Sequence, residues 1–338
     1  MGNAVETIGI RHATHANGNW YHADEDALTE QIQALLNESQ TTNYRDGTYA
    51  YATPFDEDNV QIERERPIRA LVVPHGPLQI KSAKTAAAAY RHCNPVTLQQ
   101  TKSILLLYPS HNPAVDKFYN GKCAVTGADW LETPMATLKV DTQLRHELVN
   151  TAPESFAVLP RVHDEEEHGA ELQFPWIAHI LRTCNLLDSV TVTPMMVGTM
   201  STGAEIALAN RLRPIFQRRE ILVIVSTNLC YWGTTVGYQA GDRSMTVPQF
   251  LATQDHRLLK LIQTRDVAGL AAFWLQTDHT TCGRHALAIW LRCMGGLDNI
   301  KIQVCEYQQS SDSITCAEDS CVTYGSVIAV EVEDEAQG

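Results

Sequence analysis

Three apolar runs that each end abruptly in polar turn residues constrain the fold of this chain more than any other feature. They cover residues 70–73, 104–108 and 221–225, and they lead into Pro74-His75-Gly76, Pro109-Ser110-His111 and the segment 226–232. Runs of this length, rich in branched residues and bounded by turn formers, are typical of strands buried on both faces of a parallel sheet. The sequence therefore predicts an α/β protein with a central, mostly parallel or mixed sheet and helices on both faces.

The segments around these runs carry the periodicities of helices and further strands. We expect helices over 24–36, 82–91, 142–151, 175–183, 203–217, 247–274 and 286–294. We expect strands over 190–197, 300–307 and 324–332, and a β-hairpin within 121–140 that uses residues 123–125, 130–131 and 137–140 in turn. No internal repeat or linker interrupts this order, so the sequence predicts one domain over 1–338, with a surface insertion at 37–66 and a frayed acidic tail at 333–338.

The charge and cysteine content restrict the class of protein. The formal net charge is −13, from 39 acidic and 26 basic residues, and such a surface repels a phosphate backbone, so we expect no nucleic-acid partner. No apolar run has the length of a membrane span, and the first residues do not form a signal peptide. The nine cysteines are scattered without a Cys-x-x-Cys pair, which indicates reduced thiols and a cytoplasmic location.

Polar side chains follow the three central strands at the point where each strand is expected to end. His75 and His111 follow the first two strands, and the segment from Asn228 to Tyr231 follows the third. In open α/β sheets ligands bind outside the carboxyl ends of the strands, so these residues are expected to share one crevice. Two histidines at neighbouring strand ends suit a metal ion. Alternatively, each histidine binds only a loop backbone.

A second group of candidates lies in the segment from Asp278 to His285. Gly283 permits a tight turn beside Cys282, whose thiol is either a reactive or metal-binding group or an inert buried side chain. Arg284 is suited to clamp an anionic ligand, with His285 beside it. Alternatively, Arg284 pairs with a structural carboxylate in the segment 165–167.

The acidic run from Asp164 to His168 is the third candidate. It offers a general acid or base, of which His168 is the most useful. A charge run is more often a solvated face, and that interpretation remains open here. His12 and His15 lie on a polar N-terminal arm, where we expect surface positions.

Eight short motifs occur in an order that resembles one family. They are Ala13-Thr14-His15-Ala16 with Trp20-Tyr21, Val73-Pro74-His75, Pro109-Ser110-His111, Asp164-Glu165-x-Glu167-His168, Thr193-Pro194 with Val197-Gly198, Ser226 with Cys230-x-Trp232-Gly233, Cys282-Gly283-Arg284-His285, and Tyr307-x-Gln309-Ser310-Ser311. Together they span nearly the whole chain and resemble the Memo family, which is named for a role in cell motility.

The resemblance implies a single α/β domain similar to class III extradiol dioxygenases, which use a non-haem iron. Carried over by motif, the metal ligands would be His75, His111 and Cys282. Imidazole and thiolate together suit iron, copper or zinc. The pocket at the strand ends is suited to a protein partner or a small anionic ligand, with Arg284, Asn228 and His285 as the residues expected to line it.

Several positions depart from the family pattern. Asn228 stands where the family has Asp, Tyr231 stands where it has His, and Gln173 replaces another His. A neutral amide accepts no proton and tyrosine is a poor base near neutral pH, which favours a binding or signalling role with a retained metal pocket. The alternative is a metal-dependent redox enzyme in which His168 or Tyr231 donates a proton. A third alternative is an adaptor whose polar pocket is a relict.

Overall fold

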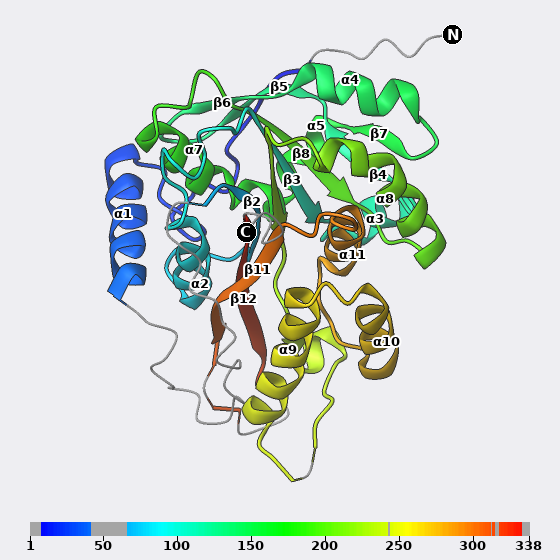
Figure 1. The fold of residues 1–338 in the computed structure, drawn as a ribbon. Coiled ribbons are helices and arrows are strands. Elements are labelled where there is room, and N and C mark those ends of the chain that lie inside the picture. Colours follow the sequence, from blue (N-terminus) through cyan, green and yellow to red (C-terminus); the bar gives the residue numbers. More distant parts are fainter. Residues whose placement is uncertain (1–7, 42–65, 243, 312, 315–317, 333–338) are drawn as a thin grey trace, which may run out of the picture.

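The computed structural model describes residues 8–41, 66–242, 244–311, 313–314 and 318–332, and its centre is a mixed nine-stranded sheet (Figure 1). Four parallel strands form the middle in the order β2 (Ile68–Val73), β9 (Ile221–Ser226), β3 (Ser103–Pro109) and β8 (Thr191–Val197). All residues of β2, β3 and β9 are buried. The predicted α/β class and the three central strands are therefore confirmed.

Antiparallel strands close both sides of this parallel centre. On one side β12 (Cys321–Glu331) pairs with β2, with β11 (Ile300–Gln309), and through its first residues with β10 (Tyr231–Trp232). On the other side β4 (Cys123–Thr126) runs antiparallel to β8 and parallel to β7 (Phe156–Leu159). The sheet is therefore mixed, with antiparallel pairing on either side of its four-stranded parallel middle.

A second, three-stranded sheet corrects the hairpin expected within 121–140. The hairpin consists of β5 (Ala128–Glu132) and β6 (Thr137–Lys139), and β1 (Ile8–Arg11) pairs with β5 in parallel. The residues expected as its first strand are β4, which lies in the large sheet instead. The alternation of side chains over 121–140 identified strands, but pairing between distant segments decided which sheet each one joined.

Helices cover both faces of the large sheet, because alternate residues of each central strand point to opposite sides. Leu71 and Val73 pack with α1 (Glu25–Thr41), α2 (Lys81–Tyr90) and α7 (Phe174–Thr183). Ala70 and Val72 pack with helices of the other layer, which run from the top right to the bottom of Figure 1. These are α4 (Thr142–Thr151), α8 (Thr202–Phe216), α9 (Val247–Gln263), α10 (Val267–Thr277) and α11 (Arg284–Cys293).

Short elements that the periodicity did not predict complete the chain. They are α3 (Pro113–Phe118), α5 (Arg161–Glu166), α6 (His168–Glu171) and a 3-10 turn, η1 (Thr234–Val236). The insertion predicted at 37–66 begins later than expected, because α1 continues to Thr41. Its remaining part, 42–65, and the tail at 333–338 lie outside the described residues. Within the described part of the chain, every helix is too short or too polar to span a membrane.

Candidate metal centre

The carboxyl ends of β2, β9 and β3 lie side by side and carry the site. His75 follows β2 by two residues, Ser226 is the last residue of β9, and His111 follows β3 by two residues. Asn228 follows β9 and fastens the first of these ends: its Oδ1 accepts from the His75 N–H at 3.1 Å, and its Nδ2 donates to the His75 carbonyl at 2.9 Å.

A hydrogen-bond chain fixes the tautomer of the His75 imidazole. The Ser226 hydroxyl donates its single proton to the Gly169 carbonyl at 2.6 Å. Its oxygen therefore accepts from its other neighbours, His75 Nδ1 at 2.9 Å and Gln173 Nε2 at 3.0 Å. Because Nδ1 carries the proton, Nε2 of the neutral ring presents a lone pair. Burial, followed by the nearby His111 and His168, lowers the pKa of His75 well below its usual value, which keeps the ring neutral.

Glu167 orients His111 in the same way. One carboxylate oxygen accepts from His111 Nδ1 at 2.7 Å, and the other accepts from the His111 backbone N–H at 2.7 Å. Gly169 allows this approach, because a Cβ there would lie 3.0 Å from Glu167 Oε1 and 3.3 Å from His111 Cε1. Nε2 of His111 is buried, faces the Cys282 sulfur and has no nitrogen or oxygen hydrogen-bond partner. A buried polar atom in this state requires an explanation.

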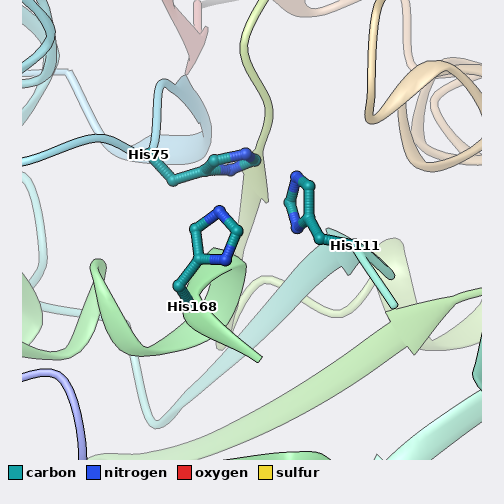
Figure 2. A group of neighbouring side chains, drawn as sticks. All are labelled: His75, His111 and His168. Atoms are coloured by element: carbon teal, nitrogen blue, oxygen red, sulfur yellow. The ribbon is translucent and has the colours of Figure 1, made fainter. Parts of the chain in front are cut away.

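His168 completes a group of three imidazoles (Figure 2). One ligand nitrogen from each of His75, His111 and His168 lies within 4.8 Å of the other two. The ring centroids of His111 and His168 are 4.2 Å apart, and that of His75 is 4.8 Å from His111 and 5.5 Å from His168. Figure 2 shows the three rings turned toward a common space. The Trp20 ring, from the N-terminal arm, lies 5.0 Å from the His168 ring.

Cys282 lies at the edge of this group. Its Sγ is 3.5 Å from His75 Nε2 and accepts a hydrogen bond from the Asn228 N–H at 3.2 Å. Burial opposes ionisation of the thiol, but the charge and hydrogen bond of His111 outweigh it and lower the pKa of Cys282. Among the described cysteines, Cys282 alone is not buried. The site thus places a half-buried sulfur with a lowered pKa beside His75 and His111.

The protonation states of the two other histidines differ for physical reasons. Burial opposes protonation of His111, but Cys282 and Glu167 outweigh it and raise its pKa to about 10. Burial and the charge of His111 lower the pKa of His168 to about 4. At neutral pH His111 therefore carries an imidazolium proton, between the Glu167 carboxylate and the Cys282 sulfur. A metal ion that binds the His111 Nε2 must displace that proton.

The donor set fits a transition-metal ion. Nε2 of His75 points a lone pair at the common space, and Nε2 of His111 is a buried atom without a nitrogen or oxygen partner. Three imidazoles with a neighbouring thiolate are a set that suits zinc, copper and iron and does not suit Mg²⁺ or Ca²⁺. His168 occupies a ligand position here, whereas the sequence indicated only a proton donor, and Cys282 lies beside the three histidines.

Asn228 and Tyr231 lie next to Cys282 but are held by internal contacts. The Asn228 side chain binds both backbone groups of His75, and its Nδ2 also donates to the Tyr231 hydroxyl at 2.6 Å. Burial, followed by the neighbouring Cys282, raises the pKa of Tyr231 well above its usual value. The hydroxyl therefore stays protonated near neutral pH, as a proton donor requires.

Arg284 and His285 start helix α11, immediately after Cys282 and Gly283. His285 Nδ1 lies 2.8 Å from Glu205 Oε1, and its Nε2 accepts from the Met200 N–H at 3.4 Å. Arg284 is exposed and donates through Nε to His285 Nε2 at 3.2 Å. Arg284 therefore contacts His285 and not the acidic run that the sequence had suggested. In that run, Glu167 binds His111 instead.

The acidic run is not a solvated face. Asp164 and Glu167 are buried, and only Glu166 in this run is exposed. Asp164 pairs with the buried Arg11 at 3.0 Å, which the strand β1 delivers to the site. His15, expected at the surface, is largely buried, with Nδ1 2.9 Å from Glu171 Oε2. Strand pairing of the N-terminal arm, a contact distant in sequence, explains the difference.

The supporting residues Ser226, Gln173 and Glu167 had no assigned function from sequence. Gln173 is buried, donates to Ser226 and to the Pro74 carbonyl at 3.0 Å, and accepts from the Tyr90 hydroxyl at 3.0 Å. Ser226 gave the only signal that was available: a polar residue at the end of a fully apolar strand, on the same edge as His75. The acidic run contained Glu167, but nothing in the sequence distinguished it from its exposed neighbours.

Comparison with known proteins places these residues in a family context. A family model described as Memo-like protein matches residues 11–328. A MEMO1 family protein of Schizosaccharomyces pombe is 26% identical over 340 residues, which cover 95% of this chain and 99% of that protein. Protein MEMO1 of Homo sapiens is 26% identical over 94% of this chain and 96% of its own length.

One solved structure, an uncharacterized protein of Escherichia coli K12, covers 77% of this chain and 98% of its own. Its sequence identity is 12% and its TM-score is 0.39, so it carries no argument about this site.

Proposed function

This chain belongs to the Memo family, and from that premise we propose that it is a metal-binding protein whose centre consists of His75, His111 and His168. One observation carries the proposal: one ligand nitrogen from each of His75, His111 and His168 lies within 4.8 Å of the other two, and the buried His111 Nε2 has no nitrogen or oxygen partner. A metal ion would satisfy this atom and the lone pair of His75 together. Iron, copper and zinc all accept such a donor set.

The residues around the centre would set its chemistry. Ser226 and Glu167 hold His75 and His111 in orientations that direct Nε2 toward the common space. Cys282 would supply a thiolate from the side of α11, which favours copper or zinc over harder ions. A bound metal would supply a Lewis acid or a redox couple at this position.

Within this proposal, the protein acts by binding and not by general base catalysis. Both carboxylate oxygens of Glu167 are engaged by His111 and Gly169. The Asn228 amide, which occupies the position of a carboxylate in the family pattern, is engaged with His75. The exposed Arg284 guanidinium near the centre suits an anionic small molecule or an acidic segment of a protein. The free state of the eight described cysteines supports a cytosolic location.

A metal-dependent redox enzyme is the second candidate, and one arrangement favours it. Cys282 Sγ lies 3.5 Å from His75 Nε2, and the Tyr231 hydroxyl next to it keeps its proton near neutral pH. A thiolate ligand beside a proton donor is a combination that supports electron transfer coupled to protonation.

Metal content measured by mass spectrometry tests the proposal. The protein is purified reduced and without oxygen, then loaded separately with Fe(II), Cu(I) and Zn(II), alongside His75→Ala/His111→Ala. We expect close to one equivalent of at least one metal in the native protein and its loss from the double variant. A matched control is His179→Ala/His256→Ala, which removes two buried histidines outside the site.

Two results would contradict the proposal. The first is a native protein that retains no metal, and the second is equal metal in the native protein and the site variant while the control behaves like native. A potentiometric titration of the loaded protein separates the two candidates. A reversible one-electron change followed by electron paramagnetic resonance supports the redox enzyme, and a centre that stays in one oxidation state leaves the binding role.

A further inference from the structure

A buried chain of polar side chains lies behind Cys282, outside the group of three histidines. His279 Nε2 is 2.9 Å from Asp255 Oδ1, and the Tyr307 hydroxyl donates to Asp255 Oδ2 at 2.8 Å. On its other side, His279 Nδ1 is 2.8 Å from Thr281 Oγ1. The four side chains come from α9, from β11 and from the segment 278–283, and all four residues are buried.

This chain ends next to the sulfur of the site. Thr281 directly precedes Cys282, and its Oγ1 also accepts from the Trp274 Nε1–H at 3.4 Å. Further back, Gln309 Nε2 donates to the Tyr307 hydroxyl at 2.9 Å. The segment that carries Cys282 is thereby connected to α9, α10 and β11 through side chains alone.

Two further contacts hold the same segment from the opposite side. Thr280 Oγ1 donates to the Tyr231 carbonyl at 2.7 Å and lies 2.7 Å from the Tyr231 N. The Gly283 N–H donates to Thr227 Oγ1 at 2.9 Å, and a Cβ at Gly283 would lie 2.5 Å from the Thr227 Cβ. Residues on both sides of Cys282 are therefore fixed to the segment 227–231, which follows β9.

Such a network is costly to bury. A buried carboxylate and imidazole are desolvated on folding, and apolar residues of similar size would often stabilise the same contact at least as well. A fully bonded polar network instead specifies one arrangement of the segments that it connects. The arrangement specified here is the distance between Cys282 and the three histidines.

We propose that Tyr307, Asp255, His279 and Thr281 are positioning residues, which hold Cys282 Sγ against the imidazole group. The part of this inference that concerns metal geometry rests on the proposed function. The part that concerns the placement of Cys282 belongs to the protein without metal and is tested there. Loss of any link should free the segment 278–283 to move away from the histidines and expose the thiol.

The test follows alkylation of Cys282 by iodoacetamide in metal-free protein, resolved by peptide mass spectrometry. The rate constant is taken at its high-pH limit, where it reports access to the sulfur and not its ionisation. Asp255→Asn and Thr281→Val should each raise this limiting rate about fivefold, as expected for the loss of one hydrogen bond that opposes local opening. Thr281→Ser, which keeps the hydroxyl, should restore the native rate.

Two comparisons separate positioning from a general loss of stability. His179→Gln alters a buried histidine on α7, in the other helical layer, so it should lower the melting temperature without raising the alkylation rate of Cys282. The double variant Asp255→Asn/Thr281→Val should react no faster than about the faster single variant, because both changes break one chain. Native alkylation rates in folded Asp255→Asn and Thr281→Val would overturn the inference.

Metal loading of the same variants distinguishes this inference from the proposed function. If the function is right, Asp255→Asn should keep its metal, and the sulfur-to-metal charge-transfer absorption of the Co(II)-loaded form should weaken. Absence of metal from every variant and from the native protein would refute the proposed function. Because alkylation is measured without metal, it would still decide whether the chain positions Cys282.

Discussion

At the scale of single residues, the site depends on which imidazole nitrogen carries a proton. Ser226 has one hydroxyl proton and gives it to the Gly169 carbonyl, so its oxygen can only accept from His75 Nδ1. Glu167 imposes the same orientation on His111. Ser226 and Glu167 thus both direct an Nε2 atom at a common point, where His75 presents a lone pair and His111 presents one after a metal ion displaces its proton.

Replacement of Ser226 by alanine tests this interpretation. Without the hydroxyl, His75 Nδ1–H loses its acceptor and the ring is free to change tautomer. Because partners of this kind contribute 10- to 100-fold to metal affinity, Ser226→Ala should weaken metal binding by about that factor. The measurement is a competition titration with a chromophoric chelator.

A buried serine at the opposite end of the sheet supplies the control for this change. Ser103 begins β3, is buried, and has no partner for its hydroxyl. Ser103→Ala should leave the metal affinity unchanged. Equal affinities in native protein and Ser226→Ala would show that the serine does not orient His75.

The residues of the centre differed in how readily the sequence revealed them. His75 and His111 were indicated by their place after apolar runs, because parallel strands bring their carboxyl ends to one edge. His168 was noticed but not as a ligand, since it lies on the four-residue helix α6 and not at a strand end. Its position depends on the packing of α6 against β3, and no local pattern encodes that contact.

At the scale of elements, the side chain of Glu171 on α6 is the hydrogen-bond acceptor for the N-terminal arm. Glu171 accepts from Arg11 Nη1 at 2.7 Å, from the His15 N–H at 2.7 Å and from the Tyr21 hydroxyl at 2.7 Å. Glu171 lies three residues after His168, so the arm and the histidine share a support. The Trp20 ring, which belongs to the same arm, lies 5.0 Å from the His168 ring.

Stability in acid should depend on Glu171. Burial opposes its ionisation, but His15 and Arg11 outweigh it and lower its pKa to about 2, from a usual value of 4.5. A lowered pKa in the folded state stabilises the protein above about pH 4.5, and this contribution, about 3 kcal/mol, is lost as the pH falls toward 2. Glu171→Gln should lose this acid-dependent component in urea unfolding measured from pH 6 to pH 2.

The comparison must be made between variants, because Asp164 contributes with the opposite sign. Burial outweighs Arg11 and raises the pKa of Asp164, so its contribution to stability grows as the pH falls. Glu166→Gln provides a matched control, since Glu166 is exposed in the same run. If Glu171→Gln and Glu166→Gln gave the same dependence on pH, Glu171 would not hold the arm.

The secondary-structure elements, like the site residues, differ in how well the sequence predicted them. The runs that became β2, β3 and β9 were predicted because their burial on both faces leaves a continuous apolar pattern. The assignment of β4 to the hairpin was wrong, because a strand of four residues has no property that selects a partner. Its neighbours β7 and β8 lie about 30 and 70 residues further along the chain, and tertiary packing alone selects them.

At the scale of the whole molecule, the centre lies where the two helical layers meet the edge of the sheet. His168 belongs to α6, whose neighbours Ala170 and Leu172 pack in the layer of α1, α2 and α7. Cys282 precedes α11, which packs in the layer with α8 and α9. A metal ion bound by both His168 and Cys282 would connect the two helical layers directly across the edge of the sheet.

Metal binding should therefore stabilise the molecule as a whole. A ligand that binds only the folded state adds RT ln(1 + [L]/Kd), which is about 2.7 kcal/mol at a free concentration 100 times the dissociation constant. For a chain of 338 residues this corresponds to a rise of about 4 °C in the melting temperature. Addition of a chelator should reverse the rise.

The variants show whether this stabilisation comes from the proposed centre. Each variant is compared with itself, with and without metal, so that the cost of the substitution cancels. His75→Ala/His111→Ala should show no rise, and His179→Ala/His256→Ala should show the native rise. Cys282→Ser should keep most of the rise if the three histidines provide the main ligands and the sulfur tunes the site. A complete loss in Cys282→Ser would instead make the thiolate an essential ligand and would require His75 and His111 to bind the ion with it.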